Sequence, residues 1–175
     1  MKTRLTYEES FRFLQKAGWQ GPGDVLPLPK GRPGYFDEDL GLSFFRTFVE
    51  EATLENLTIP RTYFSRSTVS KSSFAGTDLT ESVANWNDFE DVDFSFADLT
   101  SFDFRACVLR RIRFCNVILK DSDLRCCQFE NCDFTDADLT DAKITREAGA
   151  TLNLSSMQLA QVSWQDEDGE DPEGG

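Results

Sequence analysis

The sequence predicts a solenoid, that is, one elongated repeat domain whose core residues recur at regular intervals along the chain. Stepping by five from Phe44 to Ile144 gives twenty-one positions, and all of them are apolar. The positions two residues earlier are mostly small, so each five-residue unit has one large and one small inward side chain. Neither a helix nor a simple strand has a period of five, whereas repetition at a fixed period is the signature of repeat architectures. The length of 175 residues also suits a single domain with one core.

The repeat unit resembles that of the pentapeptide-repeat family, which reads roughly Ala-(Asp/Asn)-Leu-x-x. Residues 97–101 and 137–141 match this unit fully, and the resemblance covers about residues 42–146. It implies an all-β solenoid, a right-handed quadrilateral β-helix in which four units make one square coil and residues twenty apart stack. With strands about 4.8 Å apart, roughly five coils would form a column about 25 Å tall. Sorting by twenty supports this stacking, since one column then holds Leu54, Phe74, Phe94, Phe114 and Phe134 and another holds Ile59, Leu79, Leu99, Leu119 and Leu139.

The core pattern departs from the ideal unit at a few positions. At the inward position that is usually large, Ala84 has a small side chain. At the inward position that is usually small, larger side chains occur at Val92, Phe102, Ile112 and Val117. We expect the coils to bulge locally at these residues.

The N-terminal segment, residues 1–41, is expected to cap the first coil, because open solenoid ends recruit other chains. A capping-box pattern, Thr6-x-x-Glu9, predicts a short helix over residues 6–17, and a connector rich in Pro and Gly follows it. The apolar side of this helix is expected to consist of Phe11, Phe13 and Leu14.

The C-terminal segment, residues 147–164, is expected to form the second capping helix, and residues 165–175 an acidic, disordered tail. Ser155-x-x-Gln158 is another capping-box pattern. The apolar side that covers the last coil is expected to consist of Met157 and Ala160, flanked by Leu159 and closed by Trp164.

The charge and hydropathy of the chain limit its partners. The net charge of −13 argues against direct binding to nucleic acid, which requires Lys and Arg to replace phosphate counterions. No apolar run approaches the roughly 20 residues that span a bilayer, and the polar start of the chain lacks a secretory signal. We therefore expect a cytoplasmic protein whose partner is another protein, with neither nucleic acid nor membrane as its target.

The five cysteines are odd in number and lack CxxC spacing, so reduced thiols are expected rather than disulfides or a zinc site. Cys107, Cys127 and Cys132 occupy the small inward position and should be buried. Cys115 and Cys126 fall on outward positions.

Catalysis is not expected, because the chain contains no histidine, the usual general base and metal ligand. It also lacks the glycine-rich motifs that bind nucleotides, so no catalytic, cofactor or metal site is predicted. Aspartates that directly precede core residues are expected to accept backbone hydrogen bonds at the corners. They are Asp78, Asp88, Asp93, Asp98, Asp103, Asp123, Asp133 and Asp138.

If residues twenty apart lie above one another in successive coils, most arginines of the stretch 105–113 stand beside acidic residues and form charge ladders between the coils. The expected pairs are Arg110 with Glu90 and Glu130, Arg113 with Asp93 and Asp133, and Arg111 with Asp91. Arg105 is the exception, since its column neighbours are Asn85 and Arg125. Asp103, Asp123 or a partner would have to compensate these stacked cations.

One side of the predicted column, which we call face 1, combines residue types that are enriched in binding hot spots. Trp86 on this face is ambiguous, because it stands beside the shrunken core residue Ala84 and could fold inward to fill its volume. The outward residues of face 1 are Arg46, Tyr63, Arg66, Trp86, Arg105 and Arg125. Another side carries an acidic strip of Asp78, Glu81, Asp98, Asp121, Asp138 and Asp141.

These features predict a non-enzymatic protein that docks on a partner protein and neutralises or inhibits it, as an immunity protein does. The family resemblance implies an alternative, an acidic mimic of DNA that inhibits or protects DNA gyrase. A structural scaffold is the third alternative. The oligomeric state is left open between a monomer and a dimer formed through the terminal elements.

Overall fold

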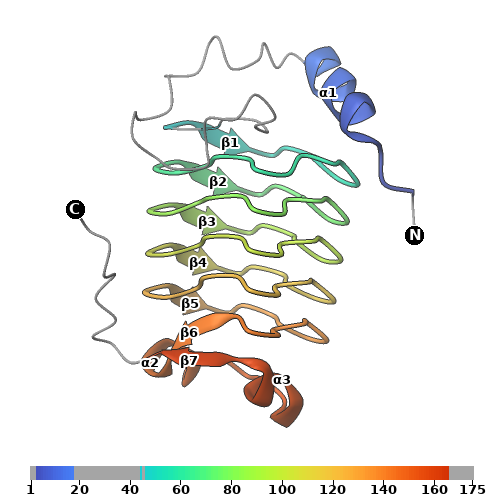
Figure 1. Cartoon of the computed structure of the whole chain (residues 1–175). Coiled ribbons are helices and arrows are strands. Elements are labelled where there is room, and N and C mark those ends of the chain that lie inside the picture. Colours follow the sequence, from blue (N-terminus) through green and yellow to red (C-terminus); the bar gives the residue numbers. More distant parts are fainter. Residues whose placement is uncertain (1–2, 18–43, 45, 166–175) are drawn as a thin grey trace, which may run out of the picture.

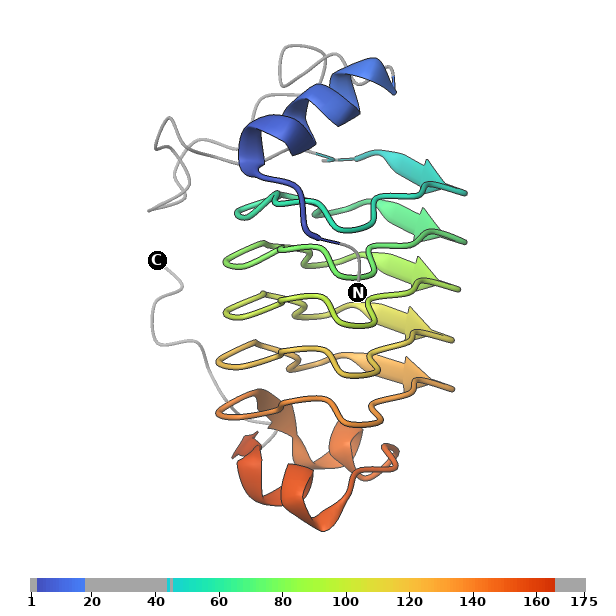
Figure 2. The ribbon, with the colours of Figure 1, turned by 90° about the vertical axis from the view of Figure 1, so that its right-hand side faces the viewer.

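The structure, a computed structural model, describes residues 3–17, 44 and 46–165, and these form a four-sided column with a helical cap at each end (Figures 1 and 2). One side, face 2, is a parallel sheet whose neighbouring strands pair twenty residues apart. Its strands are β1 (Phe48–Glu50), β2 (Thr68–Ser70), β3 (Asp88–Glu90), β4 (Val108–Arg110) and β5 (Gln128–Glu130).

The other three sides are held by single parallel bridges at the same interval of twenty residues. Face 1 carries the bridges of Tyr63, Val83, Asp103, Asp123 and Lys143, face 3 those of Thr53, Ser73, Asp93, Arg113 and Asp133, and face 4 those of Thr58, Asp78, Asp98, Ile118 and Asp138. The four-sided β-helix predicted from the repeat is confirmed.

Every coil turns its corners through a residue with left-handed backbone geometry, the last residue of each five-residue unit. Their φ values run from 47° at Lys71 to 61° at Trp86 and Phe96 for the non-glycine residues, and Gly76 has a φ of 69°. Residues other than Gly, Asn and Asp are disfavoured in this region, and several corners accordingly carry Asn, Asp or, at position 76, Gly. The remaining corners are fixed by the ladder bonds on either side of them.

The core is the predicted stack of large side chains. Of the twenty-one positions spaced by five, all but Phe129 are buried. The rings of Phe74, Phe94, Phe114 and Phe134 stack with successive centroids 5.3, 5.6 and 4.8 Å apart, which confirms the predicted column. Phe129 is only partly buried because it lies on β5, the last strand of its sheet.

Phe102 fills the volume that Ala84 leaves empty. Its ring centroid lies 6.4 Å from that of Phe64 and 4.0 Å from that of Phe104, the two core residues that flank Ala84 in the column. The bridges on face 1 continue through Val83 at the same register. The expected bulging is therefore wrong for face 1. The large side chain of Phe102, at a position that is usually small, compensates for the small side chain of Ala84 at a position that is usually large.

The N-terminal cap is the helix α1 (Tyr7–Lys16), which lies across the first coil (Figure 2) and begins with the predicted capping box at Thr6. Its buried residues are Ser10 and Leu14, and the Ser10 hydroxyl accepts the Thr58 N–H at 2.8 Å. Phe13, expected on the apolar side, is instead 41% exposed, because the helix contacts the first coil through Ser10 and Leu14.

The C-terminal cap contains two short helices and a strand rather than the single predicted helix. α2 (Arg146–Gly149) and α3 (Ser156–Gln161) lie between β6 (Lys143–Thr145) and β7 (Ser163–Gln165), which pair in parallel. This last coil keeps the twenty-residue interval although helical turns replace its strands. The side chain of Trp164, in β7, packs over Gly149 as the last contact of the core.

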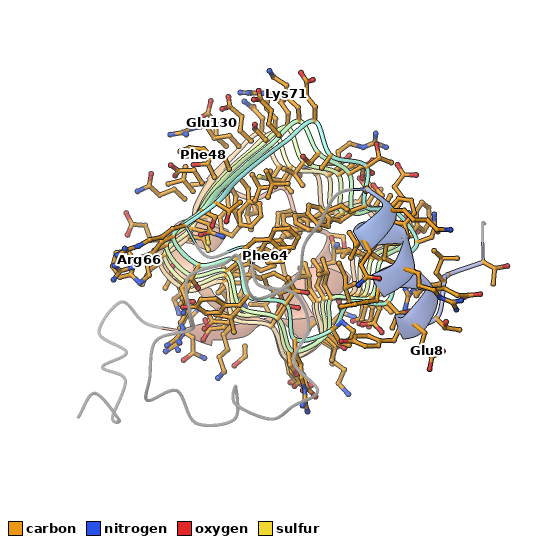
Figure 3. The ribbon with its side chains drawn as sticks, turned by 90° about the horizontal axis from the view of Figure 1, so that it is seen from above. Glu8, Phe48, Phe64, Arg66, Lys71 and Glu130 are labelled. Atoms are coloured by element: carbon orange, nitrogen blue, oxygen red, sulfur yellow. The ribbon has the colours of Figure 1, made fainter. Side chains whose placement is uncertain are left out.

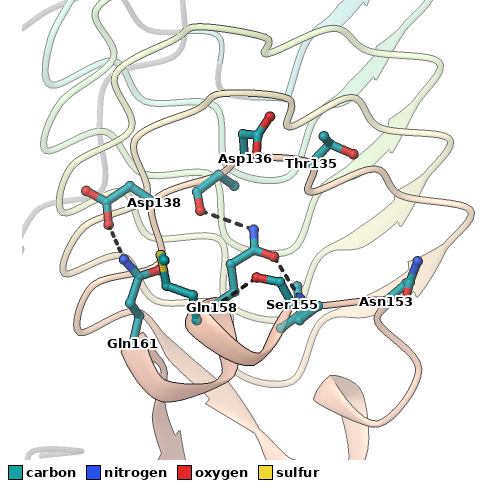
Figure 4. A pocket seen from close by; sticks show the side chains of 10 residues that line it. Thr135, Asp136, Asp138, Asn153, Ser155, Gln158 and Gln161 are labelled. Carbon is teal, nitrogen blue, oxygen red and sulfur yellow. Dashed lines mark hydrogen bonds between the residues drawn. The ribbon is translucent and has the colours of Figure 1, made fainter.

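The predicted side of the C-terminal helix is wrong, since Met157 is 75% exposed and Leu159 and Ala160 are also exposed. Gln158 faces the coil instead (Figure 4), and its Nε2 donates to the Phe134 carbonyl at 2.7 Å and to the Ala137 carbonyl at 3.1 Å. The open coil end presents backbone polar groups, which an amide can satisfy and an apolar side chain cannot. The predicted capping box at Ser155 is confirmed.

Replacing Gln158 by leucine is expected to lower the free energy of unfolding by about 1–3 kcal/mol, because the Ala137 carbonyl loses its amide donor and the Phe134 carbonyl keeps only the Ala137 N–H. Met157→Ala serves as the control and should change it by no more than about 0.5 kcal/mol. Both values can be measured by urea denaturation. A larger loss for Met157→Ala than for Gln158→Leu would contradict the observed orientation of α3.

The predicted connector that follows the N-terminal helix and the predicted tail from residue 166 onward lie outside the described residues. Gln165, assigned to that tail, belongs to β7, where it pairs with Thr145. Among the described helices, none has the length and apolar character needed to cross a bilayer.

Candidate protein-docking surface

The aspartates of the repeat serve the backbone, as predicted. Seven of the eight accept the N–H of the residue two positions later, for example Asp98 from Thr100 at 3.1 Å and Asp133 from Thr135 at 3.0 Å. The hydrogen bonds that Asp133 accepts from the hydroxyl and the backbone N–H of Thr135 lower the pKa of Asp133. No group of three potential metal ligands occurs in the part of the chain that the structure describes.

Each expected charge ladder on faces 2 and 3 is formed with one of its neighbours, except that Glu90, expected beside Arg110, pairs with Arg111. Arg111 pairs with Asp91 at 2.7 Å and also with Glu90, and its hydrogen bond lowers the pKa of Asp91. The pairs Arg110 with Glu130 and Arg113 with Asp93 lie at 3.3 and 3.4 Å. These exposed pairs fix the register between coils and leave few uncompensated guanidinium groups on the two faces.

On face 1, the arginines at positions 105 and 125 are held along the surface by aspartates. Arg105 donates to both carboxylate oxygens of Asp103 at 3.0 and 2.9 Å, and Arg125 makes the equivalent contacts with Asp123. Asn85 extends this network by donating to Asp103 at 2.9 Å. The stacked cations are thus compensated from within the protein, and both arginines have a structural role.

Tyr63, predicted to lie outward on face 1, is buried, with only 4% of its surface exposed. It pairs in register with Val83, which is also buried, so the two side chains stand next to one another on the same side of the ladder. The prediction that Tyr63 is an accessible docking residue is therefore wrong.

The remaining residues of the predicted surface gather on one edge of the column, the corner between faces 1 and 2. Arg46, Arg66 and Trp86 follow one another at this corner, twenty residues apart, and all three are exposed. The backbone N–H of Arg66 donates to the Asn85 carbonyl at 3.2 Å and that of Trp86 to the Arg105 carbonyl at 3.2 Å, so consecutive corners are linked directly.

Trp86 points outward and is 71% exposed, so the alternative that it fills the Ala84 volume is wrong. Its φ of 61° lies in the left-handed region, where a bulky side chain is unfavourable. Neither burial nor backbone preference therefore accounts for tryptophan at this corner. An exposed tryptophan beside an exposed arginine has the composition of a binding hot spot.

Phe48 is a further residue of this surface that the sequence interpretation missed. It lies on β1, is 85% exposed, and stands on face 2 next to the corner that Arg66 marks (Figure 3). The signal was present in the repeat, because Phe48 directly precedes the core residue Val49 and this position points outward.

We call the outward residues of this corner, together with the adjoining column of face 2, the corner strip. Its five levels are Arg46 with Phe48, Arg66 with Thr68, Trp86 with Asp88, Ala106 with Val108, and Cys126 with Gln128.

The acidic strip on face 4 is less continuous than the sequence suggests. Glu81 is paired with Arg61 at 2.7 Å, and Asp78 lies 4.0 Å from Arg4. Ile118 stands in register between two of the aspartates and interrupts their column.

A family model, pentapeptide repeats, matches eight copies over residues 70–105, 97–136 and 116–146. The chain belongs to the pentapeptide-repeat family. Similar solved structures include the pentapeptide repeat protein Rfr23 of the cyanobacterium Cyanothece 51142, with 10% identity over 57% of this chain and 84% of that one, at a TM-score of 0.31. A pentapeptide repeat protein of the Arabidopsis thaliana thylakoid lumen has 22% identity over 64% and 71% of the two chains, at a TM-score of 0.36.

A third similar structure is QnrB1, a plasmid-mediated fluoroquinolone resistance protein, with 17% identity over 70% of this chain and 82% of that one, at a TM-score of 0.31. At these identities the likeness concerns the fold and not the function. No curated protein matches the chain significantly.

Two of the five thiols of this pentapeptide-repeat protein, Cys107 and Cys127, are buried and fill space in the core, whereas Cys132, predicted to be buried, is only partly so. Burial raises the pKa of Cys107 well above its ordinary value and that of Cys127 to about 12. Both thiols donate to backbone carbonyls of the preceding coil, Cys107 to Ala84 at 2.7 Å and Cys127 to Phe104 at 3.0 Å. Both groups stay protonated at neutral pH.

Two cavities flank the C-terminal cap of the pentapeptide-repeat column. One, of about 520 Å³, lies between α3 and the last coil, and its buried amide, Gln158, already has its hydrogen-bond partners (Figure 4). The other, of about 390 Å³, lies below β5. It is lined by Cys126, Cys127, Gln128, Phe129, Thr145, Glu147, Ala148 and Thr151, so it adjoins the lower end of the corner strip.

Proposed function

We propose that this protein is a non-enzymatic binding module that docks on a partner protein through the corner strip, and that it neutralises or inhibits that partner. The observation that carries the proposal is Trp86, which is exposed on a left-handed corner where neither burial nor backbone preference favours it. Arg66 and Phe48 add a cation and a second exposed aromatic side chain on the same edge. A rigid column loses little conformational entropy on binding, which favours affinity.

A non-enzymatic role is supported by the absence of histidine from the sequence and by the raised pKa values of the buried thiols. The DNA-mimic alternative is supported less well, because Ile118 and paired cations interrupt the acidic strip.

Trp86→Ala is expected to weaken binding of the partner by about 2 kcal/mol or more, because truncation of a desolvated anchor removes a hot spot. The melting temperature should stay nearly unchanged, since the side chain is exposed. The measurement is quantitative capture from the native host's lysate, in which proteins retained by the wild type are compared with those retained by the variant.

Arg110→Ala is the matched control, because its guanidinium is paired with Glu130 on face 2 and should change binding and stability by no more than about 1 kcal/mol. The variant Trp86→Asn separates the effect of the indole side chain from that of the backbone conformation, since Asn adopts the left-handed region readily. This variant should bind the partner more weakly without a loss of stability. If Arg110→Ala abolishes capture while Trp86→Ala leaves it intact, the charge ladders are recognised and the corner strip is the wrong surface.

A further inference from the structure

The corner strip has a regular spacing that restricts which kind of partner segment can follow it. Its five levels are successive coils joined by ladder bonds, such as those from the Arg46, Arg66 and Ala106 N–H groups at 3.3, 3.2 and 3.1 Å. Coils paired in this way are about 4.8 Å apart, so the strip is about 19 Å long between its outer levels.

An α-helix lying along the strip matches this spacing better than an extended chain does. One face of a helix presents side chains every three or four residues, about 5.3 Å apart at a rise of 1.5 Å per residue. An extended strand presents side chains on one face about 6.7 Å apart. Only the helix can place one side chain on each level over several coils.

The corner residues of the strip are also ordered by their chemistry along it. The first two levels carry the guanidinium groups of Arg46 and Arg66, and no ion pair of the Arg66 side chain occurs among the described residues. The third level carries Trp86 next to the exposed Asp88, and the fourth the small apolar pair Ala106 and Val108. The strip then ends at the cavity of about 390 Å³, into which Cys126 and Phe129 open.

We infer that the segment of the partner that binds the corner strip is an amphipathic helix with acidic residues at one end of its contact face and apolar residues at the other. This inference rests on the proposed function. Carboxylates at positions i and i+3 meet Arg46 and Arg66, while apolar residues at i+7 and i+10 contact Trp86 and the Ala106–Val108 level. A further apolar residue at i+14 lies over the terminal cavity.

The probe is a helix-favouring synthetic peptide of about 15 residues that carries this pattern, titrated by fluorescence anisotropy against the full chain. We expect saturable binding that weakens about tenfold or more with Trp86→Ala, and that weakens with Arg66→Ala at low salt. A peptide with Lys in place of both acids should bind at least about tenfold more weakly. The original acidic peptide with a central proline, which breaks the helix, should also bind at least about tenfold more weakly.

Phe96→Ala is the matched control for Trp86, because Phe96 is also an exposed aromatic residue with φ of 61°, but at the corner between faces 3 and 4. It should leave the affinity unchanged. Equal binding of the proline-containing peptide would overturn the inference in favour of an extended segment. Absence of binding up to about 1 mM would also overturn it. In either case, selective loss of the captured partner with Trp86→Ala would still support the proposed docking surface, so the two proposals can fail separately.

Discussion

Phe114→Ala is expected to lower the free energy of unfolding by about 3–5 kcal/mol. The ring of Phe114 is fully buried and stacks between Phe94 and Phe134, with centroids 5.6 and 4.8 Å away, and meets Phe104 edge-on at 6.0 Å. Truncation leaves a cavity in the middle of a closed stack, where coils joined by ladder bonds on four sides cannot collapse to fill it. Urea denaturation followed by circular dichroism measures the loss.

Phe129→Ala is the control for this prediction. Phe129 has the same place in its repeat unit but is only partly buried at the end of its sheet. Its loss should be no more than about 2 kcal/mol. Equal losses for the two variants, or an unchanged midpoint for Phe114→Ala, would refute the stacked core.

Phe102→Ala is expected to cost about 3–5 kcal/mol, and Ala84→Phe about 1–3 kcal/mol through overpacking. The double variant should be more stable than the sum of these losses predicts, by more than about 1 kcal/mol, because the two sites share one volume. In it, a phenylalanine at position 84 stands between Phe64 and Phe104, where the ring of Phe102 lies now. The measurement is a double-mutant cycle of unfolding free energies.

Leu139→Ala supplies the matched cycle, because it lies about three coils from Ala84 and should combine with Ala84→Phe additively within about 0.5 kcal/mol. If the cycle of positions 84 and 102 is additive as well, Phe102 does not substitute for the missing core residue.

The sequence by itself determined the architecture and its register. One five-residue unit forms one side of the coil. The apolar series from Phe44 to Ile144 therefore identifies the side chains that point inward. The same arithmetic predicted the pairing of Arg111 with Asp91, because residues twenty apart must stack. Capping boxes at Thr6 and Ser155 were equally readable, since their hydrogen bonds join residues only three apart.

Only the tertiary structure decided how exceptions to the repeat are resolved, because these depend on neighbours that the local sequence does not specify. Phe102 occupies the Ala84 volume because the rings above and below leave a gap of that shape. Gln158, rather than Met157, faces the last coil because the coil end offers carbonyls that need a donor. The proposed docking surface is reduced from one face to one corner for the same kind of reason. Pairing with neighbouring residues buried Tyr63 and tied Arg105 to Asp103, which left Trp86 and Phe48 exposed on a single edge.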